Sequence, residues 1–574
     1  MRLSLFRRGP VAAPRPIIHE ISNRSQNPPA RSLGPALWIA ALLLACSYAA
    51  SIQASGFLRT RGLEIVDESG TPILLRGVGL GNWLLPEGYM WKFGERGDRP
   101  RKIEKLVSDL IGENQAARFW SEFRNNYIAE ADIQKIAELG FNSVRPALNA
   151  RLFLTEGEQP APVAEGFALL DRLVRDCKKH GLYVIIDMHA APGGQTGANI
   201  DDSRKDEPEL FTDKRNQDRL VELWIDLARR YKAEPAVAAY DLLNEPLPER
   251  TGAEAKYKDQ LEPLYRRITA AIRQVDKRHI ITLEGADWAN DWSMFASPFD
   301  DNLIYQFHYY CWDRPDHLND ITRYLDYQAK LKTPVWVGET GEKDNAIYWA
   351  TTQYFEAHRI GWSFWPWKKM ATLNTPYSIK EPAGWGAVRA YSRGEGKPSP
   401  AEAQKAFDEL LSNIKLENCV AFPDVVNALL RRVPGRVEAE NYGHEGPGRA
   451  YSVKNASAKA KYYRTSEPVP TELVSGGDQG WRTAQAIHLT AGEWTGYTVA
   501  SQASASYVGA LRAKAGSAPA SVQVEVNGHS QRLGVTNDTW VELPLAPASF
   551  SVGTNAVKVS VLTGAVSVDW LTFH

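Results

Sequence analysis

Cysteine is scarce in this 574-residue chain, and its scarcity excludes two classes of small stabilised protein. The four cysteines are Cys46, Cys177, Cys311 and Cys419, and none of them forms a CxxC pair or stands beside a histidine. Disulfide frameworks and zinc sites require such clustering, so we expect neither. The apolar spacing around Cys177 indicates an inert thiol on the core face of a helix.

An excess of one charge is also missing. Lys and Arg number 67 against 68 Asp and Glu, which provides no basic surface for nucleic acid. We therefore expect a neutral partner. The chain lacks a Gly-x-Ser-x-Gly elbow, a His-Glu-x-x-His pair and a phosphate-binding loop, because residues 77–82 have neither the final glycine spacing nor a helix start.

No apolar run is long enough for a comfortable membrane span. Residues 36–45 are apolar and short, and small residues follow them in the order of a cleavage site. We predict an N-terminal leader over residues 1–54, with a signal peptide or a signal anchor, and less readily a lipid on Cys46. The mature protein is expected to be exported, and so secreted, periplasmic or attached to the cell envelope, with this segment as its only membrane contact.

Short apolar segments alternate with amphipathic helical patterns from about residue 57 onward. The expected strands lie at residues 73–78, 141–146, 182–187, 236–243, 279–284, 303–308, 334–339 and 360–365. Eight strands, mostly separated by helices, favour an α/β fold with a closed (β/α)8 barrel, the TIM barrel, over residues 55–432. A helical stretch from about residue 399 to 432 is expected to close it.

Polar side chains recur where these strands end, and in such barrels all carboxyl ends surround one cavity. They are Arg145, His189, Asn244, Glu245, Glu284, His308, Tyr310, Glu339 and Trp365. Carboxylates at strand ends favour acid/base chemistry of the kind that cleaves glycosidic bonds, and Glu284 is a third candidate beside Glu245 and Glu339. A separation of about 5 to 5.5 Å between the two acting carboxyls would give retention of configuration, and a wider one inversion.

Seven motifs along the barrel together resemble glycoside hydrolase family 5. They are residues 76–83 (RGVGLGNW), 142–145 (NSVR), 187–193 (DMHAAPG), 243–246 (LNEP), 308–310 (HYY), 338–341 (GETG) and 361–365 (GWSFW). The opening Arg-Gly-Val and the His-Ala-Ala-Pro-Gly loop are most similar to the exo-β-1,3-glucanase and β-1,6-glucanase branch.

The resemblance implies a retaining double displacement with Glu245 as acid/base and Glu339 as nucleophile. It implies that Arg145 holds Glu339 ionised by opposite charge. Because Glu339 must be charged while Glu245 keeps a proton, their environments must separate the two pKa values.

The same resemblance assigns supporting roles to five further residues. Asn244 would bond the sugar 2-hydroxyl, and His189 another substrate hydroxyl. His308 and Tyr310 would orient the nucleophile and the sugar, and Trp365 would form the floor of the subsite for the cleaved sugar.

Residues 435–574 change to short alternating segments without helical periodicity, which predicts a small all-β sandwich. Residues 437–442, 492–499 and 568–573 resemble a carbohydrate-binding module of the family 6 or 35 type. That resemblance implies a structural calcium on Glu438, Glu440 and Asp569, although solvated strand charges are an equal alternative. Trp481 and Tyr463 are candidates for sugar stacking or for packing.

The sequence thus predicts a monomeric glycosidase that needs no cofactor for catalysis and acts on a polysaccharide or oligosaccharide, β-1,3- or β-1,6-glucan first. The alternatives are a cellulase- or mannanase-like hydrolase, a transglycosylase, a glycolipid glycosidase and a non-catalytic carbohydrate-binding protein.

Overall fold

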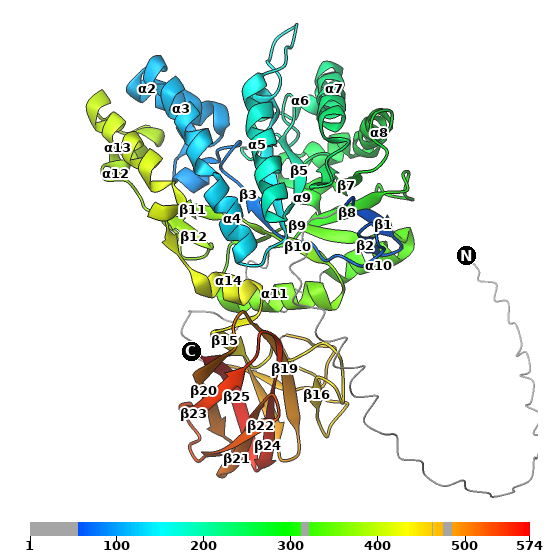
Figure 1. The fold of residues 1–574 in the computed structure, drawn as a ribbon, viewed down its shortest axis with the longest axis vertical. Coiled ribbons are helices and arrows are strands. Elements are labelled where there is room, and N and C mark those ends of the chain that lie inside the picture. Colours follow the sequence, from blue (N-terminus) through cyan, green and yellow to red (C-terminus); the bar gives the residue numbers. More distant parts are fainter. Residues whose placement is uncertain (1–55, 311–320, 462, 475–484) are drawn as a thin grey trace, which may run out of the picture. The chain divides into compact units, whose positions relative to one another are not determined.

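Eight parallel strands close into a barrel in the computed structural model, and helices surround it (Figure 1). The order around the barrel is β10-β3-β4-β5-β6-β7-β8-β9, so each strand pairs with its neighbour in sequence and the last pairs with the first. The strands are β3 (Arg76–Leu80), β4 (Ser143–Asn149), β5 (Tyr183–Ala190), β6 (Val237–Asp241), β7 (Ile280–Glu284), β8 (Leu303–His308), β9 (Val335–Gly341) and β10 (Gly361–Trp365). The predicted (β/α)8 barrel is confirmed.

The structure describes residues 56–310, 321–461, 463–474 and 485–574. The predicted leader over residues 1–54 lies outside this part of the chain, as do Cys46, Cys311 and Trp481. Within the described residues, no helix is both long and apolar enough to cross a membrane.

The first barrel strand begins later than the sequence pattern predicts, at Arg76 instead of residue 73. Ile73 and Leu75 are apolar for another reason. They belong to a small buried cluster with Leu58 and Ile65 and with residues near the starts of several barrel strands. Ile73 also donates its N–H to the carbonyl of Ile65, which lies in the hairpin of β1 (Arg59–Arg61) and β2 (Glu64–Val66). These residues therefore cover the amino-terminal end of the barrel.

The helices present one apolar face to the strands, as their spacing predicts. In the helix that follows β4, the buried positions include Leu170, Leu173, Val174 and Cys177, and the helix ends at Gly181 with a φ of +73°, a conformation that glycine adopts without a steric penalty. The helices that follow or flank the strands are α2 (Pro100–Ile111), α3 (Glu113–Tyr127), α4 (Glu130–Glu138), α5 (Ala164–His180), α6 (Glu209–Thr212), α7 (Lys214–Tyr231), α8 (Ala253–Arg273), α9 (Ala286–Ala289), α10 (Thr322–Leu331) and α11 (Asn345–Ala357).

The segment predicted to be helical from 399 to 432 is only partly so. It contains α13 (Pro400–Asn413) and α14 (Pro423–Leu429), but Val420–Ala421 between them forms the short strand β13. This strand joins β11 (Lys368–Met370) and β12 (Tyr377–Ile379) in a three-stranded sheet, a pairing between segments about 40 residues apart that helical spacing cannot reveal. Helix α12 (Trp385–Ser392) precedes α13.

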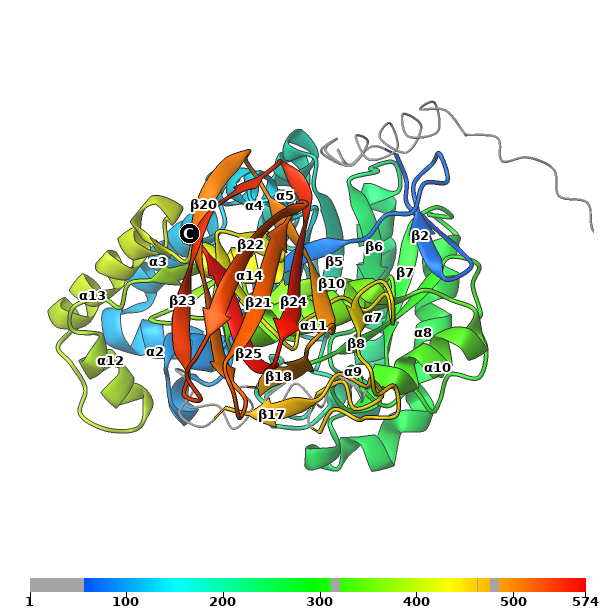
Figure 2. The ribbon, with the colours of Figure 1, turned by 90° about the horizontal axis from the view of Figure 1, so that it is seen from below.

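The C-terminal part of the chain consists of two mainly antiparallel sheets, whose long strands run side by side in Figure 2. One sheet has the order β14-β19-β24-β21-β22 with β16 beside β19, and the other has the order β17-β18-β25-β20-β23 with β15 beside β25. Alternate residues of both sheets share one buried apolar core, which confirms the predicted all-β sandwich. Its strands are β14 (Arg432–Val433), β15 (Gly435–Glu438), β16 (Tyr451–Ser452), β17 (Thr471–Leu473), β18 (Gln485–Thr490), β19 (Trp494–Ser501), β20 (Ala505–Ala515), β21 (Ala520–Val526), β22 (His529–Val535), β23 (Val541–Phe550), β24 (Gly553–Thr563) and β25 (Ala565–Phe573).

A buried ion pair fixes the chain just beyond the last barrel strand. The Nζ of Lys368 lies 2.8 Å from Oδ1 of Asp132, and both side chains are at most 1% exposed. Lys368 also donates to the carbonyl of Ile414, and Trp367 donates its indole N–H to Asp132. The pair therefore joins β11 to α4 and to the end of α13 beside β10.

Replacing Lys368 with Met should lower the free energy of unfolding by about 3–5 kcal/mol, because the Asp132 charge would stay buried without its cation. Urea unfolding of the full chain measures this change. The control is Lys105→Met, which removes an exposed lysine paired with Asp109 and should leave the stability unaltered. Equal free energies of unfolding for the two variants would contradict a stabilising role of the buried Lys368–Asp132 ion pair.

Candidate active site

A cavity of about 800 Å³ opens at the carboxyl ends of the barrel strands. Its lining is dominated by carboxylates, histidines and aromatic rings, the mixture that binds rings carrying hydroxyl groups. The lining residues include Glu87, Tyr89, His189, Glu245, Asp287, Trp288, Asn290, His308, Tyr310, Arg323, Tyr327, Glu339, Glu342 and Trp365.

Two carboxylates face each other across this cavity. Glu339 lies in β9, and Glu245 lies four residues after the end of β6. An oxygen of Glu245, an oxygen of Glu339 and a ring nitrogen of His308 all lie within 4.8 Å of one another. The backbone of Glu245 has a φ of +41°, an unfavourable conformation for a side chain with a Cβ, which indicates that the surrounding structure imposes its position.

Arg145 is the centre of charge beneath the cavity. Its side chain is fully buried, and its Nη1 lies 2.6 Å from Oε1 of Glu339. The same guanidinium pairs with Asp241 at 2.8 Å, with Glu284 at 3.1 Å and with Asp187 at 3.2 Å. One cation thus neutralises carboxylates from four strands, and these charges raise the pKa of Arg145 well above its ordinary value although burial opposes them.

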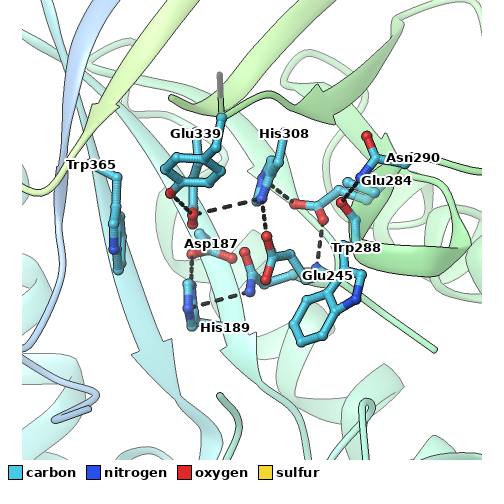
Figure 3. Close-up of polar contacts among 12 residues, drawn as sticks. Asp187, His189, Glu245, Glu284, Trp288, Asn290, His308, Glu339 and Trp365 are labelled. Carbon is cyan, nitrogen blue, oxygen red and sulfur yellow. Dashed lines mark hydrogen bonds and ion pairs between the residues drawn. The ribbon is translucent and has the colours of Figure 1, made fainter. Parts of the chain in front are cut away.

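His308 lies between the two facing carboxylates. Its Nδ1 is 2.8 Å from Oε1 of Glu245 and 3.7 Å from Oε2 of Glu339, while its Nε2 is 3.2 Å from Glu284 (Figure 3). Burial lowers the pKa of His308, but the surrounding carboxylates outweigh burial and raise it well above its ordinary value. These carboxylates therefore favour the cationic form of the imidazole.

The pKa of Glu339 is raised because burial removes the carboxylate from water. The positive charges of His308 and Arg145 act in the opposite direction, and the charge of Glu245 adds to the rise. Arg145 therefore favours the ionised form of Glu339, as the resemblance implies, but its effect is smaller than that of burial. Tyr310 adds a hydrogen bond from its hydroxyl to Oε2 of Glu339 at 2.8 Å.

His189 and Asn244 form a polar wall beside Glu339. Nδ1 of His189 lies 2.7 Å from Asp187, and Nδ2 of Asn244 lies 3.3 Å from Nε2 of the histidine. Burial lowers the pKa of His189, but Asp187 raises it to about 9. The amide of Gln195 donates to the carbonyls of both His189 and Asn244, which fixes the two loops to each other.

Trp365 stacks on His189, with ring centres 5.2 Å apart and planes inclined by 4°. Its indole N–H donates to the hydroxyl of Tyr89 at 3.0 Å. A Cβ at Gly79 would lie 2.3 Å from the Trp365 ring, and one at Gly81 would lie 2.6 Å from it. Gly79 and Gly81 are therefore required by the close approach of this indole.

The barrel residues match the family model described as "Cellulase (glycosyl hydrolase family 5)" over residues 109–371. This part of the chain is therefore similar to glycosyl hydrolase family 5.

Two curated relatives and one solved structure are among the most similar proteins. A β-xylosidase from Phanerodontia chrysosporium is 33% identical over 256 residues, 44% of this chain and 52% of the relative, so the chain spans about half the length of that protein. A probable glucan 1,3-β-glucosidase A from Emericella nidulans is 27% identical over 355 residues, 51% of this chain and 85% of the relative. The crystal structure of rutinosidase from Aspergillus niger covers 52% of this chain and 90% of its own, at 19% identity and a TM-score of 0.42.

The barrel brings together all eight residues that the sequence proposes for the site. Two of them, Arg145 and Asn244, are buried behind the cavity. The other six line it: His189, Glu245, His308, Tyr310, Glu339 and Trp365. The third carboxylate, Glu284, is fully buried and does not line the cavity. It accepts the backbone N–H of Glu245 at 2.5 Å and pairs with Arg145, so it supports the loop of Glu245.

The predicted site residues did not include Asp187 and Asp241, which pair with Arg145, or Glu87 and Trp288, which line the cavity. Asp187 and Asp241 stand within strands, where a carboxylate amid apolar residues is itself a signal of a buried cation. The Glu87 loop lies within 86–91, a segment whose motif indicates no particular specificity. Trp288 lies in a turn without periodicity, so no sequence pattern points to it.

The three residues proposed for calcium, Glu438, Glu440 and Asp569, lie in the sandwich and are buried or nearly so. Burial raises the pKa of Glu438 to about 7 and that of Glu440 well above its ordinary value. Arg436 pairs with Glu438 at 2.6 Å and Arg512 with Asp569 at 2.5 Å. Three or more His, Cys, Asp or Glu side chains could hold a metal ion where one potential ligand atom of each lies within 4.8 Å of the others. Among the described residues, the only such group is Glu245, His308 and Glu339. Tyr463 is 2% exposed and therefore a packing residue instead of a sugar platform.

Replacing Glu87 with Gln should flatten the dependence of stability on pH. Burial raises the pKa of Glu87 to about 8, helped by Glu339, while the charge of His189 opposes the rise. Between the ordinary value of 4.5 and pH 8 the folded state keeps a proton that the unfolded state loses. Stability therefore falls as pH rises through this window, by an amount on the order of a few kcal/mol.

Urea unfolding at pH 5 and pH 8 measures the effect for the wild type and for Glu87→Gln. The exposed carboxylate variant Glu395→Gln is the control and should keep the pH dependence of the wild type. A slope that survives in Glu87→Gln would contradict a buried, protonated Glu87.

Proposed function

We propose that this protein is a retaining β-glycosidase that acts by double displacement. The observation that carries the proposal is the pair formed by Glu245 and Glu339, whose nearest oxygens lie within 4.8 Å of each other. This separation is close to the roughly 5 to 5.5 Å between carboxyls of retaining enzymes and shorter than the roughly 6.5 to 9.5 Å of inverting ones.

In the first step the carboxylate of Glu339 attacks the anomeric carbon while the bond from that carbon to the leaving oxygen breaks. Glu245 gives its proton to the leaving oxygen, which departs as an alcohol, and the sugar stays bound to Glu339 as an ester. In the second step Glu245 takes a proton from water, the hydroxide oxygen attacks the same carbon, and Glu339 is released as a carboxylate.

The surrounding contacts suit these roles. Nδ1 of His308 lies 2.8 Å from Glu245 and 3.7 Å from Glu339, so a positive charge on the imidazole would stabilise whichever carboxylate is ionised. Tyr310 and Arg145 each bond one oxygen of Glu339 and so orient the nucleophile. As the resemblance implies, His189 and Asn244 would bond hydroxyls of a sugar whose ring lies against Trp365.

For the substrate we propose a neutral β-linked polysaccharide or oligosaccharide, β-1,3- or β-1,6-glucan first. The balance of 67 basic and 68 acidic residues supports a neutral partner, and one relative carries the name glucan 1,3-β-glucosidase. The other relative's name, β-xylosidase, supports small β-glycosides as the second candidate. We also propose that the chain is exported through its leader and acts as a monomer.

The proposal for the sandwich is sugar binding, with calcium held by Glu438, Glu440 and Asp569. Carboxylate oxygens are the ligands that calcium prefers, and the Oε2 atom of Glu440 is buried without a hydrogen-bond partner. A bound divalent cation would neutralise carboxylates whose burial otherwise favours protonation. Catalysis itself is proposed to need no cofactor.

The first test incubates the chain from residue 55 with β-1,3-, β-1,6- and β-1,4-glucans, mannan and xylo-oligosaccharides, and resolves the products by size. Release of single sugars from one linkage supports an exo-acting glycosidase, and a ladder of products supports endo action. The absence of products from every substrate would contradict glycan hydrolysis.

Two variants test the roles of the carboxylates. Glu339→Gly should lose activity at least about a thousandfold, and azide should restore turnover of an activated β-glycoside with an α-glycosyl azide as product. Glu245→Ala should give the β-azide instead, because azide then attacks the glycosyl ester from the opposite face. Identical product configurations from both variants would contradict the assignment, and Glu395→Gln serves as the control.

Removal of calcium should lower the melting temperature by a few degrees, because a cation bound only to the folded state stabilises it. Thermal unfolding of the full chain in calcium and in chelator measures the shift. Glu440→Gln should abolish the response to calcium. A melting temperature that is the same in both conditions would show that Arg436 and Arg512 alone balance these carboxylates.

A further inference from the structure

We propose that the β-sandwich is a permanent structural partner of the barrel, which docks on helix α11 and so holds the cavity loop that precedes this helix. Helix α11 connects β9, which carries Glu339, to β10, which carries Trp365. The inference goes beyond the proposed glycosidase function, and only its kinetic test rests on that function.

Helix α11 is buried on every side. The six consecutive residues 347–352 are all buried, and since an α-helix has 3.6 residues per turn, they point in all directions around its axis. A barrel helix needs only one apolar face, as α5 shows, because its opposite face meets water. Helix α11 therefore requires a second covering surface besides the barrel strands.

Trp349 of α11 is buried in the apolar core of the sandwich. Its side chain is 2% exposed and belongs to the same buried cluster as Val437, Ile487 and Val568 of the sandwich strands. It is absent from the main buried cluster of the barrel. Because an exposed indole would leave a large apolar surface in water, the sandwich is the surface that covers this side of α11.

Hydrogen bonds extend this contact along the helix. The side-chain amide of Gln353 donates to the backbone carbonyls of Asn441 and Tyr442, at 3.1 and 3.4 Å. Gln353 lies one turn beyond the buried tryptophan, so the sandwich contacts successive turns of α11 and not a single side chain.

The connection between barrel and sandwich is short and held by charge. Only two residues lie between the end of α14 and the start of β14. One of them, Arg431, pairs with Glu356 of α11 at 2.5 Å and donates to the hydroxyl of Thr352 at 2.9 Å. Its backbone carbonyl accepts the N–H of Ala500 in β19 at 2.8 Å. Arg431 thus binds both α11 and the sandwich, which is unlike the exposed, flexible linkers that commonly join domains.

Glu356 anchors this connection to the barrel. Arg76 of β3 donates two hydrogen bonds to its carboxylate, at 2.7 and 2.9 Å, and Trp362 of β10 donates its indole N–H at 3.0 Å. Burial raises the pKa of Glu356, but the charges of Arg431 and Arg76 outweigh burial and lower it to about 2. One ionised carboxylate therefore joins the connection to two barrel strands.

Another face of α11 contacts the loop that lines the cavity. Tyr348, the neighbour of Trp349, accepts the N–H of Lys343 on its hydroxyl at 2.8 Å, and its ring lies edge-on against Phe364 of β10 with centres 5.0 Å apart. Lys343 directly follows Glu342, whose side chain lines the cavity. Because protein interiors are close-packed, a helix held by the sandwich on one face holds this loop on the other.

Hydrogen exchange of the full chain tests the docking without reference to activity. In Trp349→Ala the amides of α11 and of the sandwich strands β15, β18 and β25 should exchange at least about tenfold faster, because the shared core opens more easily. Trp349→Phe should recover most of the protection, and Gln353→Ala should give a smaller increase. Conversely, Val568→Ala, a truncation within the sandwich core, should raise the exchange of α11.

The matched control is Trp540→Ala, which removes a half-buried tryptophan of the sandwich that does not belong to its apolar core. It should leave the exchange of α11 as in the wild type. Sandwich strands that keep their exchange rates in Trp349→Ala, or an α11 that keeps its rate in Val568→Ala, would overturn the docking.

The kinetic test measures an aryl β-glycoside at a temperature where the variants stay folded. Trp349→Ala should lower kcat about tenfold with a smaller change in KM, because the cavity wall beside Glu339 loses its exact placement. Trp540→Ala should keep both constants. Faster exchange with an unaltered kcat would overturn the claim that docking holds the cavity loop. A wild type that cleaves no glycoside would overturn the proposed function, while the exchange rates would still decide the docking.

Discussion

The buried guanidinium of Arg145 is the interaction on which the rest of the structure depends. It stands in β4 and pairs with carboxylates of β5, β6, β7 and β9, so that most of the barrel's strands at this end are joined through one charge. Carboxylates buried without a cation would cost several kcal/mol each, or would be protonated. The same charge that permits this cluster to fold also binds Glu339, which couples the stability of the barrel to the state of its proposed nucleophile.

Around this centre the molecule keeps its cavity groups in place with hydrogen bonds between loops that are distant in sequence. Glu284 fixes the backbone of Glu245, Gln195 joins the loops of His189 and Asn244, and Asp287 joins those of Trp288 and Leu247. Several of these loops have positive φ values at residues other than glycine. A site arranged in this way needs little reorganisation when a ligand binds, because the cost of ordering is met during folding.

The cavity is also divided electrostatically. Burial lowers the pKa values of His189 and His308, but neighbouring carboxylates raise both above their ordinary values, whereas burial raises the pKa of Glu87. Groups whose cationic forms are favoured therefore lie around Glu339 and Glu245, and a carboxyl whose neutral form is favoured faces them from the loop after β3.

The sequence by itself determined the barrel, the sandwich and the set of polar residues at the strand ends, because hydrophobic period and turn residues act over a few neighbouring positions. It placed Glu245, Glu339 and their neighbours at one end of the barrel, but it overextended the first strand, because Ile73 is apolar for contacts with the hairpin of β1 and β2. It also left Glu284 equivalent to the other two carboxylates. Only the tertiary structure distinguished Glu284 from them, because it buries Glu284 against Arg145. It also brought Trp288 and Glu87 to the cavity. These contacts join segments far apart in the chain, and no local sequence pattern encodes them.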